Sequence, residues 1–399
     1  MQKRLAFNRL ELAGSLGDLG TLLPMLIGMI LINGLDPMGL LLAIGLYYIG
    51  SGLYFGVTVP VQPMKVIGAY AIATGMPAQQ IFASGIWMAG FLLLIGATGL
   101  VDVIGRYTPK AVIRGVQLST GTLLMAEGTR FIVGQSKFQV MAGTAEPHLG
   151  LQSIGGIPIG IFLGILAGGI VMRFVSDRRF PAGLIVMLGG AVVGLLLGTH
   201  QGFDSLEVGF NLPRWLPFGW PAHTDWMIAL FALALPQLPM TVGNAVVANA
   251  DLSREYFGQD SQRVTYRALT ISMALANLVS AAIGGMPVCH GAGGLAAHYR
   301  FGARTAGSNL MIGAVFILLA FLLGIHALAV IYLIPMAVLG VMLLFAGSQL
   351  ALMVMDVKAR KDLFVVLMML GITLAVNLAV GFVIGIAMAY ALRSDRLDV

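Results

Sequence analysis

The sequence predicts an all-α polytopic membrane protein with about fourteen transmembrane segments, arranged as an inverted repeat of seven plus seven. Of its 399 residues, 58% are hydrophobic and 10% are charged, whereas a soluble domain carries about 25% charged residues. Long apolar runs recur along the whole chain, and the 53 glycines suit a bundle in which membrane helices pack closely.

Fourteen apolar segments are candidate spans, because a helix needs roughly 20 apolar residues to cross the bilayer. They lie near residues 11–32, 38–56, 63–77, 79–101, 109–130, 152–173, 182–199, 225–249, 264–283, 289–300, 305–325, 328–347, 362–376 and 377–393. Segments 63–77 and 289–300 are too short to cross alone, and both lie beside prolines. We therefore expect two half-helices, each preceded by a short extended segment.

Loop charges predict the orientation. The net charge of +6 could suggest nucleic acid as a partner, but the basic residues sit in short loops between apolar spans, as the positive-inside rule requires of a protein embedded in the lipid bilayer. Fourteen crossings then place both termini in the cytoplasm and the protein in the plasma (inner) membrane. The longer, cation-poor loops 131–151 and 200–224 fall outside.

The two halves of the chain resemble each other. The polar stretch GSLGDLGTLLP (14–24) precedes a break at Pro60, and PQLPMTVGNAV (236–246) precedes a break at Pro287. Seven spans per half is an odd number, so the halves would have opposite orientations. Such inverted repeats are typical of secondary transporters, whose discontinuous helices meet at the substrate site.

The stretch VPVQPMK (59–65) predicts the first half-helix. Pro60 and Pro63 remove N–H donors and disfavour helix at the residues before them, and Pro63 suits the first turn of a new helix. The free N–H groups of that turn would form an anion site near mid-membrane. Gln62 is polar there and Lys65 adds a positive charge. The alternative is that Lys65 reaches an interface and the prolines only kink the chain.

The stretch GGMPVCHGAGG (284–294) is the counterpart in the second half. Gly291 and Gly293 would let a ligand approach the backbone closely. Cys289 and His290 are the polar groups at this break. Each could contact the ligand, or His290 could be a satisfied structural residue and Cys289 a small apolar filler.

A buried carboxylate is expected on the first span. Asp18 lies deep enough in the apolar region that it needs a partner or a function. It could pair with Lys65, bind a coupling proton or cap the local backbone, and these alternatives stay open at this point.

The eighth span supplies a polar face. Gln237, Thr241 and Asn244 are spaced four and three residues apart, so they share one side of a helix. We class Asn244 with Asp18 as a candidate coupling or pairing residue. Pro236 and Pro239 are expected to open this helix near its middle.

Motifs of enzymes are absent from the sequence. There is no GxxxxGK[ST] phosphate loop, no HExxH and no paired CxxC. The single cysteine, Cys289, excludes an internal disulfide and a cysteine-rich metal site. We therefore expect a protein that is not an enzyme, without cofactor or bound metal.

Four segments carry a family resemblance. GSLGDLGTLLP, VPVQPMK, PQLPMTVGNAV and PVCHGAGGLAAHYRFGAR resemble the signature segments of the molybdate transporter family, a distant relative of the sulfate permeases. The resemblance implies a core domain of residues 1–104 and 225–325 and a gate domain of residues 105–224 and 326–399. It implies no cytoplasmic regulatory domain.

The resemblance also implies secondary import of a tetrahedral oxyanion, with molybdate as the first candidate, bound between two facing half-helix N-termini. The binding residues that it implies are Ser15, Thr21, Gln62, Lys65, Gln237, Thr241, Cys289, His290, Gly291 and Gly293. Sulfate is an alternative substrate. A proton-coupled nucleobase or organic-anion permease of the same fold is another alternative, as is a passive anion channel. The coupling ion and the oligomeric state stay open; a proton and a homodimer are the candidates.

Overall fold

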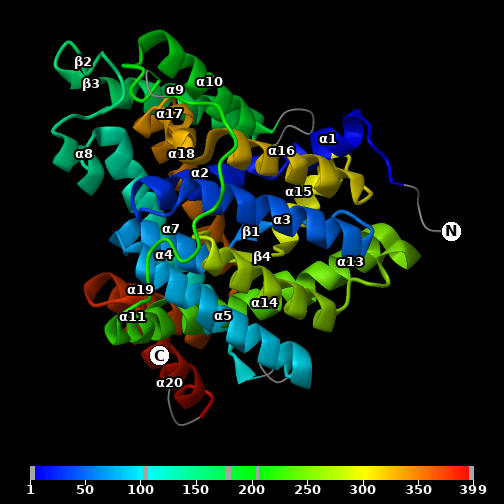
Figure 1. The fold of residues 1–399 in the computed structure, drawn as a ribbon. Helices are drawn as coiled ribbons and strands as arrows, with labels where there is room; N and C mark the ends of the chain where they lie inside the picture. The colour runs from blue at the N-terminus through cyan, green and yellow to red at the C-terminus, as the bar shows by residue number, and fades with distance from the viewer. Residues whose placement is uncertain (1–4, 102–106, 176–180, 204–205, 395–399) are drawn as a thin grey trace.

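The computed structural model describes residues 5–101, 107–175, 181–203 and 206–394. Figure 1 shows a bundle of helices, with two very short strands, β1 and β4, near its middle. Apolar residues form helix along nearly all of the chain, since a helix satisfies its own backbone polar groups without water.

The first half of the chain contains nine described helices and three strands. They are α1 (Arg9–Leu16), α2 (Leu19–Leu31), α3 (Pro37–Phe55), β1 (Gln62–Pro63), α4 (Lys65–Thr74), α5 (Ala78–Thr98), α7 (Lys110–Val133), α8 (Lys137–Ala142), the hairpin β2 (Ser153–Ile154) and β3 (Ile157–Pro158), α9 (Ile159–Phe174) and α10 (Ala182–Leu197).

The second half begins with a long composite helix. The elements of the second half are α11 (His223–Ile228), η1 (Ala229–Ala234), α12 (Leu235–Met240), η2 (Thr241–Ala248), α13 (Asn249–Phe257), η3 (Gly258–Ser261), α14 (Tyr266–Ala282), β4 (Val288–Cys289), α15 (Ala292–Phe301), α16 (Gly307–Leu323), η4 (Gly324–His326), α17 (Ala327–Ile331), α18 (Met336–Ala351), η5 (Leu352–Asp356), α19 (Arg360–Ala375) and α20 (Leu378–Ala391).

Each segment that the sequence predicts as a span contains helix in the structure. By length and hydropathy, five helices of the described chain could cross a membrane, or six if α1 and α2, which meet at 45°, form one bent span. Helices α4, α9, α10 and α20 are apolar but shorter. The protein is thus a mostly helical membrane protein.

The eighth predicted span differs from expectation. Pro236 and Pro239 do not open the helix, because one continuous helical segment runs from His223 to Ser261. The π-helical stretches η1 and η2 flank the prolines on either side. Proline removes a backbone hydrogen bond from the helix, and the wider π-helical turns accommodate this loss without ending the helix. Such π-bulges recur at functional sites.

The half-helices are confirmed as short elements that follow extended chain. Strand β1 pairs with β4 in antiparallel register, with Gln62 opposite Cys289 and Pro63 opposite Val288. Helix α4 starts two residues after the end of β1, and α15 starts three residues after the end of β4. The pairing therefore places the starts of two half-helices, more than 220 residues apart in sequence, at one crossing.

Asparagines of neighbouring helices satisfy the extended backbone. Asn277 of α14 accepts from the Val288 N–H and donates to the Val288 carbonyl, both at 2.9 Å. Asn309 of α16 donates to the Val59 carbonyl at 2.6 Å and accepts from its N–H at 3.2 Å. The Tyr48 hydroxyl donates to the Val61 carbonyl at 3.2 Å. Irregular backbone at this depth is stable because protein groups replace water.

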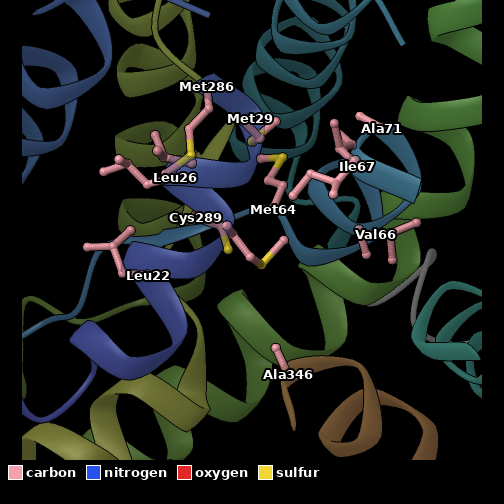
Figure 2. Close-up of a cluster of buried hydrophobic side chains, with 14 of the residues drawn as sticks. Leu22, Leu26, Met29, Met64, Val66, Ile67, Ala71, Met286, Cys289 and Ala346 are labelled. Atoms are coloured by element: carbon pink, nitrogen blue, oxygen red, sulfur yellow. The ribbon is translucent and has the colours of Figure 1, made fainter. Parts of the chain in front are cut away.

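The crossing rests on an apolar cluster (Figure 2). Met64 and Cys289, from the two extended segments, lie beside Leu22 and Leu26 of α2. These side chains are buried, and burial of each apolar side chain contributes about 1.5–3 kcal/mol. The cluster holds both half-helix starts against α2.

Glycines allow α7 and α18 to pack closely. Helix α7 packs along α18, and a Cβ on Gly121 or Gly128 would lie 2.5 Å from the carbonyl oxygens of Gly347 and Gly340 respectively. Small residues let membrane helices approach closely. The buried Glu146 carboxylate also caps α18, accepting from the N–H groups of Met336 and Ala337 at 2.8 Å each.

Candidate functional site

The N-termini of α4 and α15 meet at the strand crossing. Lys65 is the first residue of α4, and Ala292 is the first of α15. A Cβ placed on Gly293 would lie 3.8 Å from the Lys65 Nζ, its nearest neighbour. Both helix starts carry partial positive charge, so the crossing gathers two helix dipoles and one ammonium group.

The start of α15 has backbone N–H groups without a hydrogen-bond acceptor in the described chain. Its N-cap, Gly291, has no side chain to accept a bond, and the Gly291 carbonyl takes only the N–H groups of Gly294 and Leu295. Within the described chain, no acceptor bonds the N–H groups of Ala292 and Gly293. Free backbone N–H groups at a helix start favour an anion.

The start of α4 is capped from another helix. The Gln237 Oε1 atom of α12 accepts from the N–H groups of Val66 at 2.9 Å and Ile67 at 3.3 Å. Its Nε2 atom donates to the Thr241 hydroxyl at 2.9 Å. Gln237 and Thr241, which share a helix face as predicted, therefore reach the half-helix from the eighth span. The Gln237 amide oxygen thus lies where an anion would bind the free N–H groups of α4.

A Gln237→Glu variant should retain its fold and lose anion uptake by at least tenfold. A carboxylate in place of the amide oxygen caps the helix start favourably, but its charge repels an anion at the crossing. Uptake by reconstituted vesicles measures this effect. Gln262→Glu, on the exposed surface, is the control and should transport normally. Normal uptake by Gln237→Glu would show that the transported anion does not pass close to the start of α4.

Lys65 forms no salt bridge among the described residues, and the Asp18 carboxylate interacts with its charge at longer range. No carboxylate oxygen lies within the 4.0 Å of its Nζ that would define an ion pair. Its side chain is half-buried, and its charge is unfavourable at a helix start. A cation without a salt bridge at this position suits an anionic partner.

Asp18 is hydrogen-bonded to Gln62, and it interacts with Lys65 through charge alone, without a salt bridge. The Gln62 Nε2 donates to both carboxylate oxygens of Asp18, at 2.8 and 2.7 Å. The Asp18 side chain does not cap the backbone N–H groups of α2, and the Thr21 side chain of α2 interacts with the carboxylate. Asp18 thus orients Gln62, an arrangement that the sequence alternatives did not include.

Gln62 and Gly291 are in close contact. The Gln62 Oε1 is buried without a hydrogen-bond partner in the described chain. A Cβ on Gly291 would lie 1.9 Å from that oxygen and 3.5 Å from the Asn244 Nδ2. The crossing therefore brings together Gln62, Asn244 and the glycines of α15.

Three predicted residues bond elsewhere. The buried His290 ring lies 2.6 Å from the Tyr47 hydroxyl, 3.0 Å from that of Ser272 and 2.8 Å from the Pro60 carbonyl. The Cys289 thiol approaches the Pro63 carbonyl at 3.7 Å. The Ser15 hydroxyl donates to the Leu12 carbonyl of its own helix. In this structure His290 and Cys289 hold the two extended segments together.

Sequence reasoning missed the residues that fix the crossing. Asn277, Asn309 and Tyr47 do so through the bonds given above, and Asn249 donates to the His290 carbonyl at 2.9 Å. Polar side chains inside apolar spans were the available signal. Among the described residues, no group of three or more His, Cys, Asp or Glu side chains could hold a metal.

Comparison with solved structures gives the fold class. The transmembrane domain of a cyanobacterial bicarbonate transporter, BicA, matches with a TM-score of 0.66 at 15% identity, covering 96% of this chain and 97% of that one. The murine Slc26a9 anion transporter in the inward-facing state matches with a TM-score of 0.68 at 13% identity, covering 98% and 69%. The chain thus has the fold of these membrane transporters.

Sequence comparison gives the family. The model of the family described as molybdate transporter of the MFS superfamily matches residues 10–124 and 229–350. Molybdate transporter 2 of Arabidopsis thaliana is 32% identical, over 91% of this chain and 82% of that protein. Molybdate transporter 1 of Chlamydomonas reinhardtii is 30% identical, over 86% and 83%. This chain belongs to the molybdate transporter family.

Proposed function

We propose that this protein is a secondary active transporter that imports a tetrahedral oxyanion, molybdate, bound between the N-termini of α4 and α15. The observation that carries the proposal is the β1–β4 crossing, which brings together two positive helix starts and Lys65, a cation without a salt bridge. The family assignment and the anion-transporter fold support an anion as substrate.

The chemistry of the crossing suits an oxyanion. A tetrahedral dianion offers only acceptor oxygens, and charge-assisted hydrogen bonds from cations and backbone N–H groups are the strong ones. Lys65 and the N–H groups of Ala292 and Gly293 are donors, and the Thr241 hydroxyl and the Asn244 amide can donate nearby. Displacement of the Gln237 oxygen would add the N–H groups of α4.

The proposed transport architecture has fourteen spans in two inverted repeats. Residues 1–104 and 225–325 would form a core domain, in which α3 packs on α16 and α5 on α14. Residues 105–224 and 326–399 would form a gate domain, in which α7 packs on α18 and α19. Movement of the core against the gate would expose the site alternately. The basic loops favour cytoplasmic termini and an inner-membrane location.

Asp18 is the proposed coupling group. Its carboxylate is buried, bonded to Gln62, and close to where a dianion would sit. The negative charges of the Asp18 carboxylate and the dianion would repel each other. A proton on Asp18 would remove this repulsion, so the proton and the oxyanion would enter together. We expect uptake by the wild type to rise as the external pH falls, and uptake by Asp18→Asn to lose this dependence. An unchanged pH profile in Asp18→Asn would exclude Asp18 as the proton site.

Uptake into proteoliposomes tests the proposed substrate. Molybdate should accumulate, and excess unlabelled molybdate should compete better than sulfate, while uracil should not compete. Strong competition by sulfate would favour a sulfate transporter, and uptake of uracil alone would favour a nucleobase permease. Conductance far above carrier turnover would indicate a channel.

A further inference from the structure

A second group of cations lies at the start of α7, away from the half-helices. The Arg114 Nε and Nη2 atoms donate to the two Asp356 carboxylate oxygens at 2.9 and 2.6 Å. The Lys110 Nζ lies 2.8 Å from Asp356 Oδ2. The two cations and one carboxylate leave a net charge of +1, and the Arg114 side chain is only 16% exposed.

A cavity of about 250 Å³ opens beside these cations. Lys110, Arg114 and Gln117 line it from one face of α7, at positions i, i+4 and i+7. Gly243 and Asn244 of the π-helical stretch η2 line the opposite wall. The cavity therefore lies between α7, of the proposed gate, and η2, of the proposed core.

Uncommitted amides complete the donors of this cavity. Gln117 Oε1 accepts from the Arg114 Nη1 at 2.8 Å, and its Nε2 has no partner among the described residues. The Asn244 amide likewise makes no hydrogen bond in the described chain. Neither of its polar atoms is among the fully buried atoms without a partner. An oxyanion in the cavity would find two cations and two amide N–H₂ groups.

Asn244 joins the cavity to the crossing. Its Nδ2 lies 3.5 Å from where a Cβ of Gly291 would be, at the N-cap of α15. Asn244 thus lies near the start of α15 and also lines the cavity of Arg114 and Lys110. Bidentate Arg–carboxylate geometry is also the geometry that arginine offers to an oxyanion.

We propose that this cavity is a second oxyanion site on the path between the half-helix site and the cytoplasm, and that Asp356 is a tethered competitor for it. Asp356 occupies Arg114 and Lys110 when no oxyanion is present and is displaced as the oxyanion passes. The cations are thereby prevented from holding the substrate tightly after it leaves the half-helices. The inference rests on the proposed function, since it assigns that substrate an exit route.

Calorimetric titration with molybdate tests the second site in a Lys65→Ala background, where the half-helix site is weakened. Adding Asp356→Asn should strengthen molybdate binding at least tenfold, and adding Arg114→Gln to that double variant should remove the gain. The gain should shrink at high salt, because exposed charges are screened. Asp356 and its partners are partly exposed, so these variants should fold, as size-exclusion profiles can verify.

The control uses the other arginine pair of α7. Arg130 donates to Glu127 at 2.9 Å, and Glu127→Gln frees Arg130 away from the cavity. In the same Lys65→Ala background it should give no gain. Equal binding with and without Asp356→Asn, or an equal gain from Glu127→Gln, would overturn the proposal. Failure of the proposed function is distinguishable, because it would show as absent binding by the wild type.

Discussion

Replacing Lys65 with alanine should abolish oxyanion uptake and leave the protein folded in the membrane. Lys65 is the only cation that the structure brings to the described half-helix starts, and it forms no salt bridge among the described residues, although the buried Asp18 carboxylate interacts with its charge at longer range. A hydrogen bond to a charged group contributes about 1.5–3 kcal/mol. A loss of about 3 kcal/mol weakens binding roughly a hundredfold. Initial uptake rates in vesicles measure the effect.

The control for this variant is a lysine of α8 that lies at the opposite end of α4 from Lys65. Exposed Lys137 lies 3.5 Å from the Thr74 carbonyl, at the C-terminus of α4. Lys137→Ala should transport like the wild type. Removal of Lys65 is expected to stabilise α4 slightly, since a cation at a helix N-terminus is unfavourable. Wild-type uptake by Lys65→Ala would contradict the proposed role of the half-helix site.

Gly291→Ala should reduce uptake by more than tenfold. The added Cβ would meet Gln62 Oε1 at 1.9 Å, and Gln62 cannot withdraw freely because Asp18 holds its amide. Overpacking of this kind costs about 1–3 kcal/mol. The start of α15 would move away from α4, and the free N–H groups of α15 would no longer point toward the crossing. Uptake and molybdate binding should fall together.

Gly90→Ala is the matched glycine control. Gly90 lies inside α5, where an added Cβ meets nothing within 4 Å, and alanine favours helix over glycine. This variant should fold and transport normally. If Gly291→Ala also transported normally, the close contact between Gln62 and the start of α15 would have no part in substrate binding.

Much of the fold follows from local sequence. Apolar length predicted where helices lie, because membrane helices satisfy their own backbone. Pro60, Pro63 and Pro287 predicted the extended segments, since proline both removes a donor and restricts the preceding residue. Opposed half-repeats then predicted that two half-helices would meet, and the β1–β4 pairing places both starts at one crossing.

The contacts within the site could not be predicted in the same way. Gln237 caps α4 and Gln62 bonds Asp18, yet each pair is distant in sequence, so helix periodicity carries no information about it. Pro236 and Pro239 suggested a break, but π-helical turns on both sides accommodate them. The backbone adjusts where neighbouring helices supply packing, and sequence spacing does not record those neighbours.

The most direct test of the central claim is a calorimetric titration of the purified protein with molybdate, repeated on Lys65→Ala and with sulfate as competitor. Saturable molybdate binding that sulfate displaces poorly, weakened roughly a hundredfold in Lys65→Ala, is the result that we predict from an oxyanion held between the starts of α4 and α15. A folded wild-type protein that binds neither anion, or equal molybdate binding by both proteins, would contradict it.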